Sequence, residues 1–363
     1  MQRILVIGGG IMGMLTAREL HAAGCLVTLI DRQQPGREST WAGGGIVSPL
    51  FPWRYLDSIT ALATWSQAAY PDLCESLLAD TGIDPEFTRN GMLMVAPDEI
   101  DTAVAWAEKH ERHLEVIDRE TFQTLEPQAA HPPARGLWMP EVAQLRNPRL
   151  AKALKADLHR RGVELVTDTP VTGLRCDTQG CQGAETAQGL IKGDQVVVCA
   201  GSWTGELLKG FSSTPDIRPV RGQMLLYKTD PGSISRITLE DQRYIIPRRD
   251  GHVLFGSSME EAGFDKSTST EMREELHALV CERFPVMCDK PLVKHWAGLR
   301  PGSPAGVPYI GRHPQLENLF VNAGQFRNGV VLGAASGRLA ADLVLGRQPI
   351  LDPKPYGWTA ARG

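Results

Sequence analysis

"RILVIGGGIMGMLTARELHAAGCLVTLIDR", residues 3–32, is the stretch that decides the fold. The apolar run from Arg3 to Ile7 predicts a buried strand, and apolar residues at helical spacing predict a helix from Ile11 to Ala23. The run CLVTLID then predicts a second strand. A strand, a helix and a strand in this order are typical of an α/β protein with a parallel sheet.

The turn between the first strand and the helix contains Gly8, Gly10 and Gly13 in a GxGxxG pattern. Gly8 permits a tight turn, Gly10 lets the backbone approach a pyrophosphate, and Gly13 lets the helix pack closely on the strand. Asp31 ends the second strand about 20 residues later, where a carboxylate can accept hydrogen bonds from a ribose diol. Glycines that serve packing alone are the alternative, but the full context favours a dinucleotide. The acid disfavours a 2′-phosphate, so NAD and FAD remain.

Length and composition are those of an ordinary globular chain, and 363 residues suggest two domains. The net charge is −4, and no basic face with interleaved aromatic residues predicts binding to nucleic acid. The apolar runs are shorter than the roughly 18 residues that a membrane span needs. Seven cysteines without a CxxC pair indicate reduced thiols, and neither they nor the nine histidines cluster at metal-ligand spacing. We expect a cytoplasmic protein without a metal site.

The segment after Asp31, RQQPGRESTWAGGGIVSPLFPW, is rich in glycine, serine, threonine and proline and predicts a long loop. A nicotinamide enzyme would continue here with further strand and helix units. Three consecutive glycines beside Trp41 instead indicate a chain that passes over a flat ring system. A flexible surface loop is the alternative.

Seven stretches in order along the chain resemble the FAD-dependent amine oxidases with the D-amino-acid oxidase fold, most closely the bacterial glycine oxidases of thiamine biosynthesis. Besides the N-terminal unit they are STWAGGGI, VVVCAGSWTGELL, PVRGQM, YIIPRRDGHVLFGSS, GLRPGSPAGVPYIG and NAGQFRNGVVLGAASG. The resemblance covers essentially the whole chain. It implies a Rossmann-type FAD-binding domain joined to a mostly antiparallel α+β substrate domain.

The resemblance also implies how the chain is divided between these domains. The FAD-binding domain is discontinuous and takes residues 1–84, 146–219 and 301–363, and the substrate domain takes 85–145 and 220–300. Local patterns agree with this fold. Asn147 to Gly162 predicts an amphipathic helix, DQVVVCAGSW predicts a central parallel strand, and a hairpin is expected near Asp250-Gly251.

The resemblance places FAD against the glycine turn, the loop after Asp31, the backbone around Val171 and the start of the C-terminal helix. There the backbone N–H groups and the helix N-terminus stabilise negative charge on the reduced flavin; a purely structural helix is the alternative. We expect non-covalent FAD, since no cysteine follows Cys288. The predicted cofactor contacts are Gly8, Gly10, Ile11, Met12, Gly13, Asp31, Arg32, Ser39, Thr40, Gly44, Gly45, Ile46, Val171, Asn328, Gly329, Val330 and Val331.

The resemblance implies a substrate site centred on Arg300, whose planar guanidinium matches a substrate carboxylate. The resemblance adds a hydrogen bond from Tyr244, the backbone carbonyl of Arg327 as an acceptor for the amine, and Met259 as an apolar wall. Each has an ordinary alternative: a surface arginine, a strand aromatic, a loop ion pair or core packing. We assign no role to His295, although it is close to Arg300 in sequence.

The resemblance implies an oxidase that converts glycine and other small amino acids to an imine, then to glyoxylate and ammonia. O₂ would accept the electrons and give H₂O₂, and the product would serve thiazole synthesis for thiamine. A D-amino-acid or sarcosine oxidase, a quinone-linked D-amino-acid dehydrogenase and a non-catalytic flavin-binding module are the alternatives. The loop GGGIVSPLFPW departs from the glycine oxidases, which carry alanines and a methionine there, so substrate size stays open. A homo-oligomer is expected.

Overall fold

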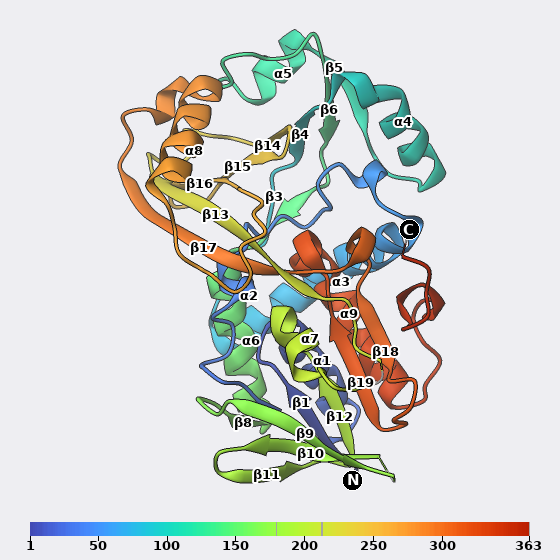
Figure 1. The fold of residues 1–363 in the computed structure, drawn as a ribbon. Coiled ribbons are helices and arrows are strands. Elements are labelled where there is room, and N and C mark those ends of the chain that lie inside the picture. Colours follow the sequence, from blue (N-terminus) through green and yellow to red (C-terminus); the bar gives the residue numbers. More distant parts are fainter. Residues whose placement is uncertain (179, 212, 363) are drawn as a thin grey trace.

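The computed structural model describes residues 1–178, 180–211 and 213–362. The chain forms two parts, each built on a large sheet, and two long strands extend from the upper sheet towards the lower part (Figure 1). The predicted α/β class is confirmed. The division of the chain at residues 84, 145, 219 and 300 stays a prediction.

The lower part contains a six-stranded sheet. Its strands are parallel except for β18, which pairs antiparallel with β19. The predicted central strand is confirmed, because β12 lies between β19 and β1 and pairs parallel with both. The order is β18 (Tyr309–Arg312), β19 (Leu319–Ala323), β12 (Gln195–Val198), β1 (Arg3–Ile7), β2 (Leu26–Ile30) and β8 (Glu164–Val166).

The two faces of this sheet are covered differently. Ile4 and Val6 belong to a core that includes residues of the helices, whereas Leu5 and Ile7 belong to a core shared with the small sheet β9–β11. This alternation follows from the two-residue repeat of a strand. The helices are α1 (Ile11–Ala22), α3 (Asp57–Thr81), α6 (Asn147–Arg161) and α9 (Gly329–Val344), and the small sheet has β9 (Val171–Asp177), β10 (Gly180–Thr186) and β11 (Gly189–Lys192).

Both helices predicted from the local patterns are present. Helix α1 begins at Ile11 as predicted and ends one residue earlier than expected. Helix α6 stops at Gly162, which has a φ of 85°, a left-handed conformation that glycine adopts at low cost.

The upper part contains an eight-stranded sheet with helices α4 (Ile100–Lys109), α5 (Arg119–Leu125) and α8 (Thr270–Arg283) around it (Figure 1). Neighbouring strands are antiparallel except β14 and β4. The predicted hairpin is confirmed: β15 and β16 pair antiparallel, and Gly251 has a φ of 82° in their turn. The order is β17 (Leu292–Gly302), β13 (Arg218–Lys228), β16 (His252–Gly256), β15 (Arg243–Pro247), β14 (Ile237–Glu240), β4 (Met92–Val95), β6 (Arg135–Met139) and β5 (Glu115–Asp118).

The register of this sheet brings distant residues to one face. Tyr244 on β15 is opposite Gly256 on β16, which is opposite Met224 on β13, which is opposite Trp296 on β17. Arg300 follows Trp296 by four residues, so the two-residue repeat puts it on the same face.

The segment predicted as a long loop contains one helical turn, α2 (Ser39–Ala42). Two hydrogen bonds hold the first two residues of this turn: Ser39 Oγ donates to the carbonyl of Leu299 at 2.5 Å, and Thr40 Oγ accepts from the N–H of Ile11 at 2.9 Å. Other short elements are β3 (Thr88–Arg89), β7 (Ala143–Gln144) and α7 (Thr204–Leu207).

The structure locates the cysteines, the potential metal ligands and the long helices of the described chain. The seven cysteines are all free thiols, as predicted. Within the described ranges, no group of three or more potential metal ligands occurs. No helix of the described chain combines the length and apolar character needed to cross a membrane.

Candidate cofactor and substrate site

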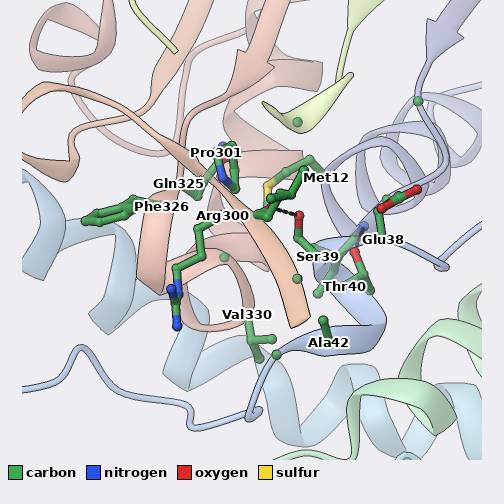
Figure 2. Close-up of a pocket in the computed structure, with 18 of the residues that line it drawn as sticks. Met12, Glu38, Ser39, Thr40, Ala42, Arg300, Pro301, Gln325, Phe326 and Val330 are labelled. Carbon is green, nitrogen blue, oxygen red and sulfur yellow. Dashed lines mark hydrogen bonds between the residues drawn. The ribbon is translucent and has the colours of Figure 1, made fainter. Parts of the chain in front are cut away.

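One cavity of about 420 Å³ is lined by residues of both large sheets, a volume within the usual range of ligand sites. Figure 2 shows Arg300 and Glu38 on opposite sides of Ser39 and Thr40. We call the end around Asp31 and Glu38 the nucleotide end, and the end around Arg300 the substrate end.

In the glycine turn at the nucleotide end, Gly8 and Gly13 allow close packing, whereas Gly10 lies beside the open cavity. Gly8 has a φ of 109°, and a Cβ on Gly13 would lie 1.8 Å from the carbonyl oxygen of Gly8, so both positions need glycine for the strand and helix to meet. A Cβ on Gly10 would meet only Thr40 Oγ, at 3.4 Å, and Gly10 lines the cavity. The first N–H groups of a helix have no intrahelical acceptor. Ile11 donates its N–H to Thr40 Oγ, so those of Met12 and Gly13 can bind an anion here.

Asp31 lines the same end, and its carboxylate already accepts two backbone hydrogen bonds. Oδ2 accepts from the N–H of Gly9 at 2.6 Å, and Oδ1 accepts from the N–H of Gln33 at 2.8 Å. Burial raises the pKa of Asp31, although these two bonds act to lower it. Each carboxylate oxygen can accept a further hydrogen bond, so a ribose hydroxyl can still be bound.

The other predicted residues of this end have partners in the protein. The guanidinium of Arg32 lies 3.6 Å from the ring centre of Trp203 and donates to Glu38 at 2.6 Å. Val171, the first residue of β9, lines the cavity beside Pro170.

The loop Gly43–Gly45 crosses the middle of the cavity. A Cβ on Gly45 would lie 2.0 Å from the carbonyl oxygen of Leu145. The N–H of Leu145 donates to the carbonyl of Gly45 at 2.8 Å. A Cβ on Gly44 would lie 2.8 Å from the Cδ1 of Ile246 and 3.3 Å from the ring of Tyr244. The close approach of these neighbours explains why three glycines occur in a row.

The start of α9 differs in part from the prediction. Gly329 and Val330 line the cavity, whereas Asn328 and Val331 are 2% and 1% exposed and are not among its lining residues. The helical repeat gives the reason, because residues next to each other on a helix face different directions. Contacts to FAD from Asn328 and Val331 stay a prediction.

Arg300 extends into the substrate end from β17. Its Nη2 donates to Ser257 Oγ at 2.6 Å, and its Nη1 donates to the carbonyls of Ser258 at 3.2 Å and Arg221 at 3.3 Å. Within the described chain none of these acceptors is a carboxylate. Burial lowers the pKa of the guanidinium. Of five N–H donors, two therefore remain, on Nε and Nη2, for an external acceptor.

A glycine makes room for this guanidinium. A Cβ on Gly222 of β13 would lie 2.2 Å from both terminal nitrogens of Arg300. Gly222 also lines the cavity. The position of Arg300 therefore depends on the absence of a side chain on the neighbouring strand.

Tyr244 is close to Arg300 through a residue that the sequence analysis missed. The Tyr244 hydroxyl donates to Ser257 Oγ at 3.1 Å, the same oxygen that accepts from Arg300. Ser257 is 2% exposed. The signal was available in the stretch YIIPRRDGHVLFGSS, but serines after a strand are too common to single out.

The two remaining substrate predictions have different outcomes. Arg327 lines the cavity, and its side chain donates to Gln242 at 3.3 Å. Met259 is 48% exposed and is not among the lining residues in the described structure. Backbone bonds link Glu260 to Arg221, and the Glu260 carboxylate accepts from Arg221, whereas the neighbouring Met259 is exposed to solvent. An apolar wall from Met259 is not seen.

Several residues that line the cavity were not predicted from the sequence. These include Leu50, Asn147, Cys199, Trp203, Met224, Gln325 and Phe326. They come from elements far apart in the sequence, and only the fold brings them together.

Comparison with known proteins decides the family. The model of a family described as FAD dependent oxidoreductase, DAO, matches residues 3–343. The chain belongs to this family. It is 48% identical over 356 residues to a protein named glycine oxidase from Pseudomonas aeruginosa, and the match covers 98% of each chain.

Two further likenesses bear on the fold and the pathway. The crystal structure of glycine oxidase from Geobacillus kaustophilus is similar with a TM-score of 0.91 and 25% identity, over 100% of both chains. A protein named bifunctional protein ThiO/ThiG from Trichormus variabilis is 28% identical over 349 residues, which cover 94% of this chain and 52% of that protein. The resemblance and the D-amino-acid oxidase fold predicted from the sequence are confirmed.

FAD is therefore the cofactor of this FAD-dependent oxidoreductase, as predicted. The residues of the cavity fit it. The glycine turn leaves Gly10 open to a pyrophosphate, Asp31 has acceptor capacity for a ribose, and a flat ring would lie along the Gly43–Gly45 loop, which lines the cavity. The individual contacts stay predictions.

Proposed function

We propose that the protein is an oxidase that deaminates glycine and other small amino acids. The overall reaction consumes the amino acid, O₂ and water and yields an oxoacid, ammonia and H₂O₂; glycine gives glyoxylate. The observation that carries the proposal is Arg300, a partly buried cation with two free N–H donors and no carboxylate partner in the described structure.

The proposed roles follow from the groups at the substrate end. Arg300 would bind the substrate carboxylate through Nε and Nη2, because its other donors are held by the protein. Tyr244 would add a hydrogen bond to the same carboxylate by turning its O–H away from Ser257, and the carbonyl of Arg327 would accept from the amine. When bound, FAD would supply the acceptor for the hydride that leaves the substrate Cα, with O₂ as the final electron acceptor. The chain's contribution is orientation, since no acid or base within the cavity is required for this transfer.

The apolar lining of the substrate end supports a substrate without a charged side chain. Ile46, Leu50, Met224 and Tyr244 line the cavity and belong to one core cluster. These apolar side chains favour glycine over amino acids with a charged side chain.

Three further parts of the proposal rest on the relatives and on the sequence. The thiamine pathway is supported by the names of relatives, including the bifunctional ThiO/ThiG protein. Non-covalent FAD is supported by the absence of cysteine after Cys288 in the sequence. The cavity does contain Cys199, but burial raises its pKa to about 12, so it is a poor nucleophile. Cytoplasmic location and a homo-oligomer stay predictions.

The test is H₂O₂ release from the purified, FAD-loaded protein with glycine, sarcosine, D-alanine and D-proline. We expect glycine to be among the best substrates and the Arg300→Ala variant to be inactive with all four. A strong preference for D-proline or D-alanine would identify a D-amino-acid oxidase instead. Reduction of the flavin by glycine without O₂ consumption would identify a dehydrogenase.

A further inference from the structure

Arg248, which follows β15, is buried without an acidic partner. The residue is 7% exposed. Its Nη1 donates to Gln144 Oε1 at 2.5 Å and to the carbonyl of Leu145 at 2.8 Å, and its Nη2 donates to the carbonyl of Gly44 at 2.7 Å. Within the described residues, none of these acceptors is a carboxylate. The guanidinium thus joins the hairpin to the loop that crosses the cavity.

Burial of the charged Arg248 guanidinium is energetically unfavourable. Burial, together with the neighbouring cation of Arg146, lowers its pKa to about 10. This value is still above neutral pH, so the guanidinium keeps its charge. The nearby acids Glu86 and Asp250 are paired with Arg146, at 3.2 and 2.8 Å. Unpaired buried cations are rare in proteins because they lose their hydration.

The bond to Gly44 sets the direction of one peptide group in the cavity. In a planar trans peptide, the carbonyl and the following N–H point in opposite directions. Because the Gly44 carbonyl points to Arg248, the N–H of Gly45 points away from it. Both glycines line the cavity, and the described residues provide no acceptor for the N–H of Gly45.

This peptide lies at the substrate end of the cofactor site. A Cβ on Gly44 would lie 3.3 Å from the Tyr244 ring, and Tyr244 shares Ser257 Oγ with Arg300. Asp31, by contrast, marks the nucleotide end. The part of FAD that meets the substrate is its ring system, so the Gly44–Gly45 peptide is beside the ring and not beside the ribose.

We propose that Arg248 is a positioning residue that fixes the Gly44–Gly45 peptide against the FAD ring and makes bound FAD easier to reduce. The ring gains negative charge on reduction, and an oriented N–H backed by a fixed cation favours that charge. The inference rests on FAD binding in this cavity and not on the identity of the substrate.

The test compares three variants: Arg248→Gln, Arg248→Lys and, as a matched control, Arg249→Gln. Arg249 is the next residue, but its side chain is 48% exposed and pairs with Asp84 at 2.9 Å. The midpoint potential and dissociation constant of FAD and the melting temperature of the apoprotein are measured without any substrate. Failure of the glycine proposal would leave all three readouts unaffected.

Arg248→Gln should weaken binding of reduced FAD at least about tenfold relative to oxidised FAD, which lowers the midpoint potential by about 30 mV for a two-electron couple. Arg248→Lys keeps the charge but not the fork, so its potential should stay near that of the wild type while oxidised FAD binds several-fold more weakly. Arg249→Gln should change neither quantity.

Two results would overturn the proposal. One is a wild-type potential and FAD affinity in Arg248→Gln, which would leave Arg248 with a structural role alone. The other is an equal fall in potential in Arg249→Gln, which would show that any nearby cation suffices. If Arg248→Gln does not fold, Arg248→Lys decides: wild-type FAD affinity with an unchanged apoprotein melting temperature contradicts the proposal.

Discussion

The nucleotide end and the substrate end of the cavity are built in different ways. Gly8, Gly10 and Asp31 belong to one strand–helix–strand unit, and the carboxylate of Asp31 is held by two N–H groups from that same unit. Arg300 and Tyr244 come from strands β17 and β15, which are separated in the sheet by β13 and β16. Their common partner, Ser257, follows β16.

This difference predicts which residues bind FAD and which bind the substrate. At the nucleotide end, the predicted contacts are mostly with backbone groups, so FAD binding there depends on the local chain conformation. At the substrate end, charged and hydroxyl side chains converge, so strand register is what counts. Changes at one end should therefore affect one ligand and leave the other almost unaffected, and the following variants test this separation in order of expected effect.

The largest effect is expected for Arg300→Ala. Loss of a buried bidentate charge pair costs about 3 to 5 kcal/mol. At 1.36 kcal/mol per decade, kcat/KM for glycine should fall by roughly two to four decades. Arg300→Lys should recover only part, because an ammonium lacks the planar fork. Steady-state kinetics at matched FAD content measure this. Wild-type kinetics in both variants would show that Arg300 does not bind the substrate carboxylate.

Asp31→Ala should act on the other ligand. The lost hydrogen bonds to a carboxylate are worth roughly 1.5 to 3 kcal/mol, so FAD should dissociate about ten- to a hundredfold more readily at 1.36 kcal/mol per decade. The KM for glycine, measured with saturating FAD, should not change. Fluorescence titration of the apoprotein gives the FAD dissociation constant. An unchanged FAD dissociation constant would show that Asp31 does not bind FAD.

Gly222→Ala should produce a smaller loss at the substrate end. The new Cβ would lie 2.2 Å from the terminal nitrogens of Arg300, a flexible group that can move aside. Displacement from its preferred rotamer costs roughly 0.5 to 1.5 kcal/mol, so kcat/KM should fall by up to about one decade. Gly311→Ala is the control, since its Cβ would meet only the Cα of Gly357, at 3.9 Å. Equal kinetics in the two variants would contradict the account.

The smallest effect concerns Glu260, which holds the segment that carries Ser258. Burial raises the pKa of Glu260, but hydrogen bonds from Ser258, Arg221 and Gln223 outweigh it and leave the pKa below its ordinary value of 4.5. The ionised carboxylate thus stabilises the fold above the unfolded pKa, and this contribution is lost as pH falls through the folded pKa.

Glu260→Gln should therefore lower the free energy of unfolding at pH 7 by about 1 kcal/mol. The difference from the wild type should shrink as the pH falls below about 4. Chemical denaturation at both pH values measures it. A difference that grows at low pH would show that the sign is wrong.

The sequence alone predicts the nucleotide end better than the substrate end. The glycine turn, β1, α1 and Asp31 were predictable because their causes lie within 30 residues. Arg300 and Tyr244 could be named only through resemblance to a family, since their proximity depends on the register of four strands. The partners Ser257 and Arg248 were missed for that reason. Met259 was expected in the pocket wall, but it is exposed to solvent beside the bridge between Arg221 and Glu260.

The most direct test of the separation is anaerobic reduction of bound flavin by glycine, measured together with FAD affinity in Arg300→Ala and Asp31→Ala. The account predicts that Arg300→Ala binds FAD within about threefold of the wild type, a change below roughly 0.7 kcal/mol, but is reduced at least about a hundredfold more slowly. Asp31→Ala, once loaded, should be reduced at the wild-type rate. Reduction of Arg300→Ala within about threefold of the wild type in rate and half-saturation, or a loss of FAD as large as in Asp31→Ala, would contradict it.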